Sequence, residues 1–241
     1  MCLIVFAWQV VPGVPLIAAA NRDEFYDRPA VAASHWPEAP QVYAGRDLKG
    51  GGSWMGITED GKFAALTNIR GPEERRPDAP SRGALVADYL AGGASASDYI
   101  QRIASSGDAY NGFNLVIGDR SGLYWYSNRG AGDERNGRQL APGIYGVSNG
   151  LLDSPWPKVV RTKAQFASLL CQGAPEDAYF EMLADTTRAP DVRLPDTGIA
   201  LELERNLSAV CIETPGYGTR TSTVVKLYAT APPELHERVI Q

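Results

Sequence analysis

The chain has 241 residues, a formal net charge of -5 and a pI near 5.2. This length suits a single domain with a sizeable core, and we expect one domain over residues 1–241. A mild acidic excess argues against a nucleic-acid partner, because a nucleic-acid-binding surface needs clustered Lys and Arg. The first apolar run is too short to span a bilayer and has no signal-peptide flanks, so we expect a cytoplasmic protein without stable membrane insertion.

The three cysteines, Cys2, Cys171 and Cys211, are odd in number and have no metal-like spacing. This usage fits a reducing compartment better than a disulfide framework. Cys171 ends an apolar helical pattern and Cys211 lies in an apolar run, so both are predicted to be core residues. No metal site and no cofactor are expected.

The first element in chain order is a predicted hairpin. The apolar, β-prone run Cys2 to Val11 forms one strand, Pro12-Gly13-Val14-Pro15 the turn, and Leu16 to about Arg22 the partner strand. Both strands are mostly apolar, which is typical of a sheet covered on both faces. The proline-rich stretch from Pro29 to Pro40 is predicted to be a long, irregular surface connection without chemistry.

A second predicted hairpin joins a short strand around Trp54 to Ile57 with Phe63 to Thr67, which ends at Asn68. The Asp60-Gly61 dipeptide between them is a strong turn signal. The charged, proline-containing segment Ile69 to Ser81 that follows is predicted to be an exposed loop able to fold over a neighbouring surface.

The remainder of the chain shows helical and strand patterns in separate blocks. Apolar residues three or four apart predict helices over Gly83 to Leu90, Ser97 to Ala104, Pro155 to Leu170 and Pro175 to Leu183. Strands are predicted over Phe113 to Ile117, Leu123 to Tyr126, Gly143 to Ser148, Ala209 to Glu213 and Thr219 to Tyr228. Hairpins with helices segregated between them predict an α+β fold, arranged as a four-layer αββα sandwich.

Cys2 is the candidate nucleophile. If Met1 is removed, Cys2 carries the free α-amine, and an amine with a pKa near ~7.7 accepts the proton of a thiol with a pKa near ~8.5. No separate histidine is then required, and neither His35 nor His236 has the setting of a catalytic triad. The alternative is that Cys2 is a small apolar residue buried in the first strand.

The second predicted strand ends in four polar residues, Asn21-Arg22-Asp23-Glu24. The hairpin returns this end to the start of the first strand, beside Cys2, where a carboxylate would orient the α-amine and an arginine would favour the thiolate. Since neighbours on a strand point to opposite faces, Asn21 and Asp23 share one side and Arg22 and Glu24 the other. The alternative is an exposed polar strand end with its own salt bridges.

Gly50-Gly51-Gly52 is a further candidate binding feature. It is not a phosphate loop, because Lys49 precedes the glycines and no helix with Lys-Ser or Lys-Thr follows. Gly52 would allow close approach of the backbone to a ligand, with Trp54 as an apolar wall. The alternative is a flexible turn.

Several short motifs, taken in order, make the chain resemble the NRDE family, which includes the transport and Golgi organization protein 2 of animals. The family is in turn similar to the N-terminal nucleophile (Ntn) hydrolases, which use an αββα sandwich, and above all to the cysteine-type bile-salt hydrolases and penicillin acylases. The motifs are Met1-Cys2, Asn21-Arg22-Asp23-Glu24, Gly51-Gly52-Ser53-Trp54-Met55-Gly56, Leu66-Thr67-Asn68, Tyr145-Gly146-Val147-Ser148-Asn149-Gly150 and Tyr217-Gly218-Thr219-Arg220-Thr221.

The resemblance implies an amine-activated Cys2, with Arg22 and Asp23 as the paired residues at the strand end. In the cysteine-type branch the corresponding Arg and Asp are separated, whereas here they adjoin, so which of the two contacts Cys2 stays open. Asn149 takes the role of an oxyanion donor, worth typically ~3 kcal/mol, or is a turn residue before Gly150.

Two further residues keep two interpretations each. Arg220 takes the late basic role implied by the resemblance, pairing with a substrate carboxylate or with Asp23, or is a surface strand arginine. Asn68 is a second oxyanion donor or a strand cap. Together with Asn21, Gly52 and Trp54, Asn68 completes the predicted substrate-binding set.

Two functions of different class follow. The first is an amidohydrolase that cleaves a small non-peptide C–N amide through an acyl-enzyme on Cys2. The second is a non-catalytic carrier of haem, lipid or acyl-CoA on the same fold. For haem, the chain offers Cys2, His35 and His236 as axial ligands and has no Cys-x-x-Cys-His motif. The oligomeric state stays open.

Overall fold

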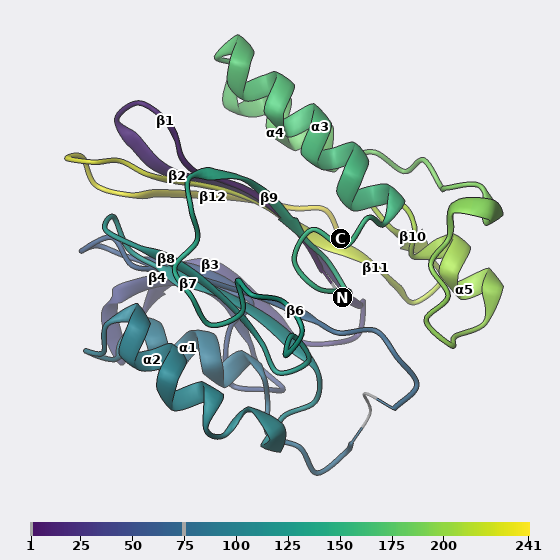
Figure 1. Cartoon of the computed structure of the whole chain (residues 1–241), viewed down its shortest axis with the longest axis horizontal. Coiled ribbons are helices and arrows are strands. Elements are labelled where there is room, and N and C mark those ends of the chain that lie inside the picture. Colours follow the sequence, from purple (N-terminus) through teal and green to yellow (C-terminus); the bar gives the residue numbers. More distant parts are fainter. Residues whose placement is uncertain (1, 74–75) are drawn as a thin grey trace.

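The fold, seen in a computed structural model that describes residues 2–73 and 76–241, has four layers (Figure 1). Two antiparallel sheets lie face to face, with helices α3 and α4 covering the first sheet and α1 and α2 covering the second. The predicted four-layer αββα sandwich is therefore confirmed.

The first sheet, called sheet A, has the strand order β10-β11-β2-β1-β9, with β12 also paired to β11. Its central strands β1 and β2 form the predicted opening hairpin, with Cys2 opposite Arg22 and Trp8 opposite Leu16. The strands are β1 (Cys2–Val11), β2 (Val14–Phe25), β9 (Gly143–Val147), β10 (Glu213–Thr214), β11 (Tyr217–Leu227) and β12 (Glu234–Val239).

The second sheet, called sheet B, runs β3-β4-β5-β6-β7-β8 in sequence order. Consecutive strands are neighbours, so the sheet is a meander built from the predicted second and third hairpins and one hairpin before them. The strands are β3 (Ala30–Trp36), β4 (Ala39–Asp47), β5 (Met55–Thr58), β6 (Phe63–Asn68), β7 (Phe113–Gly118) and β8 (Leu123–Ser127).

The first four α-helices begin and end close to the predicted positions, and the short helix over Leu201–Asn206 was not predicted. Pro157 lies in the first turn of α3, where its missing N–H costs little, and Gly173 ends the helix with a φ of 59°. The helices are α1 (Gly83–Ala91), α2 (Ala96–Ala104), α3 (Pro157–Gln172), α4 (Glu176–Leu183) and α5 (Leu201–Asn206), with short 3₁₀ turns at Gly107–Ala109 and Asp191–Arg193.

The apolar strands explain why both sheets are covered on both faces. In β1, Ile4, Phe6 and Trp8 pack between the two sheets. The intervening Leu3 and Val5 pack under α3 and α4. Because successive side chains point to opposite faces, an almost uniformly apolar strand needs a layer on each side.

The predicted connection from Pro29 to Pro40 is wrong, since this stretch contains β3 and the start of β4. Its prolines lie where a strand tolerates them: Pro29 before β3, Pro37 in the turn, and Pro40 ahead of Val42, where the pairing with β5 begins.

Two other predictions need correction. The segment from Ala209 to Ile212 is buried but is not a strand; the Cys211 N–H donates to the Asp185 carbonyl and the Ile212 N–H to the Thr219 hydroxyl, so its donors do not follow a ladder. Cys171, predicted to be core, is exposed near the end of α3, whereas Cys211 is buried as predicted. The apolar residues before Cys171 continue the helix pattern in the sequence, but the last buried residue of α3 is Phe166, so Cys171 lies beyond the buried face of the helix.

The predicted loop from Ile69 to Ser81 contains no helix or strand in its described residues, and residues 74 and 75 lie outside the described part. Across the described ranges, no helix combines the length and the apolar character needed to cross a membrane.

Candidate functional site

The end of the opening hairpin brings Cys2 to the polar tetrapeptide. Cys2 lies directly opposite Arg22, and Leu3 lies opposite Asn21, in the β1–β2 ladder. The hydroxyl of Ser148, just after β9, donates to the Cys2 carbonyl oxygen at 2.8 Å. The start of β1 is therefore held from both neighbouring strands.

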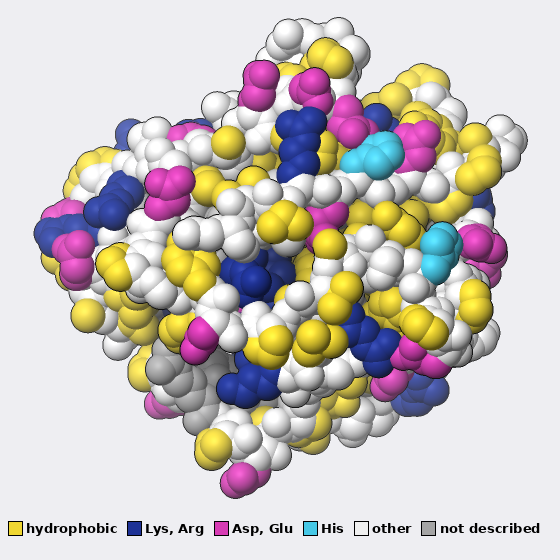
Figure 2. Space-filling view, turned by 180° about the vertical axis from the view of Figure 1, so that it is seen from behind, with side chains coloured by type: hydrophobic (Ala, Val, Ile, Leu, Met, Phe, Trp, Pro, Cys, Tyr) yellow, Lys and Arg dark blue, Asp and Glu magenta, His cyan; other side chains and the backbone are white. Residues whose placement is uncertain are grey.

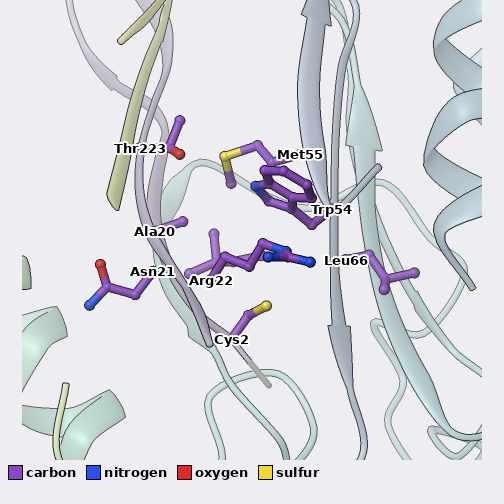
Figure 3. A pocket seen from close by; sticks show the side chains of 9 residues that line it. Cys2, Ala20, Asn21, Arg22, Trp54, Met55, Leu66 and Thr223 are labelled. Atoms are coloured by element: carbon purple, nitrogen blue, oxygen red, sulfur yellow. The ribbon is translucent and has the colours of Figure 1, made fainter. Parts of the chain in front are cut away.

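The alternation predicted for the tetrapeptide is visible at this end of the sheet. Figure 3 shows Cys2 and Arg22 pointing into the space between the sheets, and Asn21 pointing the other way. Arg22 is 5% exposed; its guanidinium lies 4.3 Å from the Trp54 ring centroid and its Nη2 is 3.9 Å from Asp47 Oδ2. Only about 10 Å³ of free space remains between Cys2, Arg22 and Trp54.

The side-chain amide of Asn21, on the other face, makes all its hydrogen bonds within the protein. Its Nδ2 donates to the carbonyl oxygens of Leu183 at 2.8 Å and Val210 at 2.9 Å, and its Oδ1 accepts from the Ser222 hydroxyl at 2.6 Å. These contacts attach β2 to the end of α4 and to β11. The structure therefore places Asn21 away from the side chains of Cys2 and Arg22.

Asp23 lies on the helical face of sheet A and is 1% exposed. Its Oδ1 accepts from the Thr219 hydroxyl at 2.7 Å, and that hydroxyl in turn accepts from the Ile212 N–H. Burial raises the pKa of the Asp23 carboxyl, and the charge of Lys158 is the strongest opposing influence. The Asp23 carboxyl is thus buried and held by a hydrogen bond from a hydroxyl that is itself fixed in place.

The thiol of Cys2 is influenced by both residues of the predicted pair. Burial raises its pKa, and the negative charge of Asp23 raises it further, whereas the charge of Arg22 and a hydrogen bond with the Asp23 backbone lower it. Both Arg22 and Asp23 therefore act on Cys2, the first from the space between the sheets and the second from the adjoining backbone and the opposite face. A partly buried thiol with a raised pKa needs a base to ionise.

Sequence reasoning missed Lys158, in the first turn of α3. The side chain is 1% exposed, and among the described residues its Nζ has no hydrogen-bond partner. The signal was present in the helix pattern, because Lys158 falls on the same stripe as the buried residues Thr162 and Phe166, at intervals of four.

Asn149 lies fully buried where sheets A and B meet. Its Nδ2 donates to the Asn68 carbonyl oxygen at 2.9 Å, and its Oδ1 accepts from Arg70 Nη2 at 3.3 Å. Neither Asn149 nor Gly150 has a positive φ, so these contacts rather than a two-residue turn of the primed type hold Asn149. The Asn68 carbonyl oxygen thus fixes Asn149 in place, and Asn68 also lines a cavity.

Arg70 is the second buried cation near this site that sequence reasoning missed. It forms an ion pair with Glu204 of α5, and both side chains are 4% exposed. Its backbone N–H donates to the Asn149 carbonyl oxygen at 2.8 Å. The residues after β6 are thereby fixed to the end of β9 and to α5.

Two predicted residues contact the protein rather than the Cys2 side chain. The Arg220 guanidinium donates to the carbonyl oxygens of Phe25, Arg28 and Gln241 at 2.7–3.2 Å. A Cβ at Gly52 would lie 2.2 Å from the Gly83 carbonyl carbon, so the close backbone approach that Gly52 allows is to the start of α1.

A cavity of about 810 Å³ adjoins the site. Its walls combine three arginines with Glu24 and a set of apolar side chains; they include Arg28, Arg70, Arg82, Phe25, Ile69, Ile199, Leu203 and Leu207. Figure 2 shows Lys and Arg side chains recessed among hydrophobic ones on one face of the molecule. Tyr217 connects this cavity to the site: burial raises its pKa well above the usual value, and the charges of Asp23 and Cys2 add to the rise.

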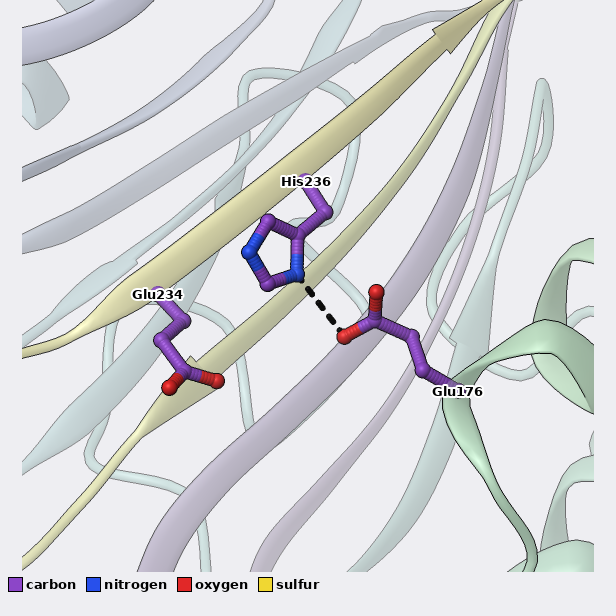
Figure 4. A group of neighbouring side chains, drawn as sticks. All are labelled: Glu176, Glu234 and His236. Carbon is purple, nitrogen blue, oxygen red and sulfur yellow. Dashed lines mark hydrogen bonds and ion pairs between the residues drawn. The ribbon is translucent and has the colours of Figure 1, made fainter.

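One group of side chains outside the site has the composition of a metal centre. Figure 4 shows Glu176, Glu234 and His236, whose ligand atoms all lie within 4.8 Å of one another. The Glu176 Oε2 atom already contacts His236 Nδ1 at 2.9 Å and Lys226 Nζ at 3.2 Å. Since a lysine ammonium occupies the position next to this carboxylate, the group is satisfied as an ion-pair network.

Comparison with known proteins agrees with the motifs. The model of a family described as "Transport and Golgi organisation 2" matches residues 1–241. The Transport and Golgi organization protein 2 homolog of Bos taurus is 39% identical over 99% of this chain and 92% of its own length, and the Homo sapiens homolog is 36% identical over the same shares.

Among solved structures, a Caenorhabditis elegans N-acylethanolamine-hydrolyzing acid amidase ortholog is similar, with a TM-score of 0.51, 12% identity and full coverage of both chains. At this identity the likeness concerns the fold, which is that of the Ntn hydrolases.

Proposed function

Because the chain belongs to the Transport and Golgi organisation 2 family and has an Ntn-hydrolase-like fold, we propose that it is a cysteine amidohydrolase. Its substrate would be a small non-peptide C–N amide. The observation that carries the proposal is the pairing of Cys2 with Arg22, with the Asp23 backbone hydrogen-bonded to the thiol. The proposal requires Cys2 to be the first residue of the mature chain; Met1 lies outside the described residues.

In the proposed reaction, the α-amine of Cys2 accepts the thiol proton and the sulfur attacks the amide carbon, forming a C–S bond. The ammonium then returns its proton to the leaving nitrogen as the C–N bond breaks, which leaves a thioester. Water adds to the thioester carbon and gives a proton to the amine; the C–S bond then breaks, the acid leaves, and the ammonium returns its proton to the sulfur. Arg22 would stabilise the thiolate, and Asp23 would hold the protonated amine.

Asn149 fits the role of oxyanion donor in one specific way. Its amide has two N–H groups, and one of them donates to the Asn68 carbonyl oxygen. The other N–H would serve the developing oxyanion, an interaction typically worth ~3 kcal/mol. Arg220 is committed to three backbone carbonyl oxygens, so in this proposal it supports the β2 end rather than the substrate.

The test combines intact-mass measurement with substitution of Cys2. We expect the purified protein to lack Met1 and to hydrolyse N-acylethanolamines or related small amides. Cys2→Ala should reduce hydrolysis by on the order of a thousandfold or more while leaving the circular dichroism spectrum unchanged. Cys171→Ser, which removes an exposed thiol, is the matched control and should retain full activity. A mature chain that begins with Met1, or full activity in Cys2→Ala, would refute the proposal.

A carrier of haem, lipid or acyl-CoA is the second candidate. It is favoured by the cavity of about 810 Å³, whose lining includes apolar and arginine side chains but not Cys2. The two functions separate experimentally: haem titration followed by absorbance, or pull-down with immobilised acyl-CoA, should be positive for a carrier, and binding of acyl-CoA should not depend on Cys2. Amide turnover without binding of either ligand would remove the carrier.

A further inference from the structure

Lys158 is a buried cation that the proposed reaction does not use. It lies in the first turn of α3, the helix that packs on β1 and β9, and Val159 beside it packs over Gly146, where a Cβ would come within 2.8 Å of the valine side chain. Its side chain is 1% exposed, and its Nζ makes no hydrogen bond to any described residue. An ammonium in such a place is costly unless a charge nearby compensates for it.

The charged and titratable groups that act on Lys158 come from four separate parts of the chain. They are Asp23 of β2, Arg70 of the segment after β6, Cys2 of β1 and Glu204 of α5. Arg70 and Glu204 form an ion pair with each other, so their charges largely cancel. The charge that remains to balance Lys158 is that of Asp23.

We propose that Lys158 is a positioning residue that keeps the Asp23 carboxyl ionised beside Cys2. The relation is reciprocal, because a buried carboxylate and a buried ammonium each offset the free-energy cost of burying the other's charge. An ionised Asp23 is the form that would hold the protonated α-amine of Cys2, so this role rests on the proposed function. Lys158 itself does not contact the reacting atoms.

The directions of the pKa shifts agree with this role. Burial lowers the pKa of Lys158 to about 8, and the charge of Asp23 is the strongest influence that raises it. Burial raises the pKa of Asp23, and among the opposing influences that of Lys158 comes first. Loss of the Lys158 charge should therefore move the ionisation of Asp23 to higher pH.

The first test follows the pH dependence of Cys2 alkylation by iodoacetamide, in a Cys171→Ser background so that the exposed thiol does not react. The rate reports on Asp23, because its charge raises the pKa of the Cys2 thiol. In a plot of alkylation rate against pH, the ionisation of Asp23 should give an inflection that is absent from Asp23→Asn. This inflection should move up by about one to three pH units in Lys158→Met and stay in place in Lys158→Arg. A Lys158→Met profile that superimposes on that of the parent overturns the proposal.

The second test is a double-mutant cycle with urea unfolding, which applies even if one variant folds poorly. Lys158→Met and Asp23→Asn should each lower the urea midpoint, and the double variant should be more stable than Lys158→Met alone, because it leaves no buried charge unbalanced. Equal instability of the single and double variants overturns the pairing. Neither test uses turnover, so a chain without amidase activity would refute the proposed function and leave this result standing.

Discussion

Two clusters of charged side chains lie on the helical side of sheet A, at opposite ends of β11, and they differ in their access to water. The buried charge cluster consists of Asp23, Lys158, Arg70 and Glu204, none more than 4% exposed. The exposed charge cluster consists of Glu176, Lys226 and His236, whose side chains are 23–53% exposed.

The difference shows that residue type alone does not identify a site. Both clusters combine carboxylates with cations, yet water screens the exposed charge cluster, so its pairs contribute little to stability or to pKa shifts. In the buried charge cluster each charge depends on the others, and Cys2 lies next to it. Three substitutions sharpen this comparison.

The largest effect is expected for Arg70→Met. The substitution leaves Glu204 buried without its partner, and breaking a buried ion pair in this way typically costs about 3–5 kcal/mol. Urea unfolding measures the loss. The matched control is Arg70→Met/Glu204→Gln, which removes both charges and should recover most of the stability. A loss of less than about 1 kcal/mol in the unfolding free energy of Arg70→Met would mean that this ion pair contributes no more than an exposed one.

Much of the fold was predictable because the informative patterns are local. The opening hairpin, the β5–β6 and β7–β8 hairpins and the first four α-helices follow from apolar periodicity and turn residues. The failure from Pro29 to Pro40 has a physical reason: a proline argues against a strand only where its N–H would join a ladder, and that depends on pairing partners that the sequence does not reveal.

The site was partly predictable for a similar reason. The hairpin register alone places Arg22 opposite Cys2. Lys158 was out of reach as a site residue, because its significance comes from the packing of α3 against sheet A, although a lysine on the apolar stripe of a helix was a visible signal. Arg70 could not be predicted as a site residue either, since its partner Glu204 is 134 residues away in sequence.

The second effect, intermediate in size, concerns the stability of the protein at alkaline pH. The pKa of Lys158 is about 8 in the folded state and near ~10.4 in an unfolded chain. Between these values the unfolded state binds more protons, so stability should rise with pH over this range. The wild type should gain about 2 kcal/mol relative to Lys158→Met between pH 8 and pH 10. Urea unfolding of both proteins at several pH values measures this difference, and a constant difference would contradict the assignment.

The smallest effect is expected for Glu176→Gln in the exposed charge cluster. Partial burial raises the pKa of Glu176, but hydrogen bonds with His236 and Lys226 outweigh it, and the net pKa is lowered. The stabilisation is therefore present above the carboxyl's unfolded pKa near ~4.3 and is lost as the pH falls through its folded value. At neutral pH the variant should lose less than about 1 kcal/mol, and 1 M salt should reduce the loss further. If Glu176→Gln instead cost as much as Arg70→Met, exposure to water would not be what separates the exposed charge cluster from the buried one.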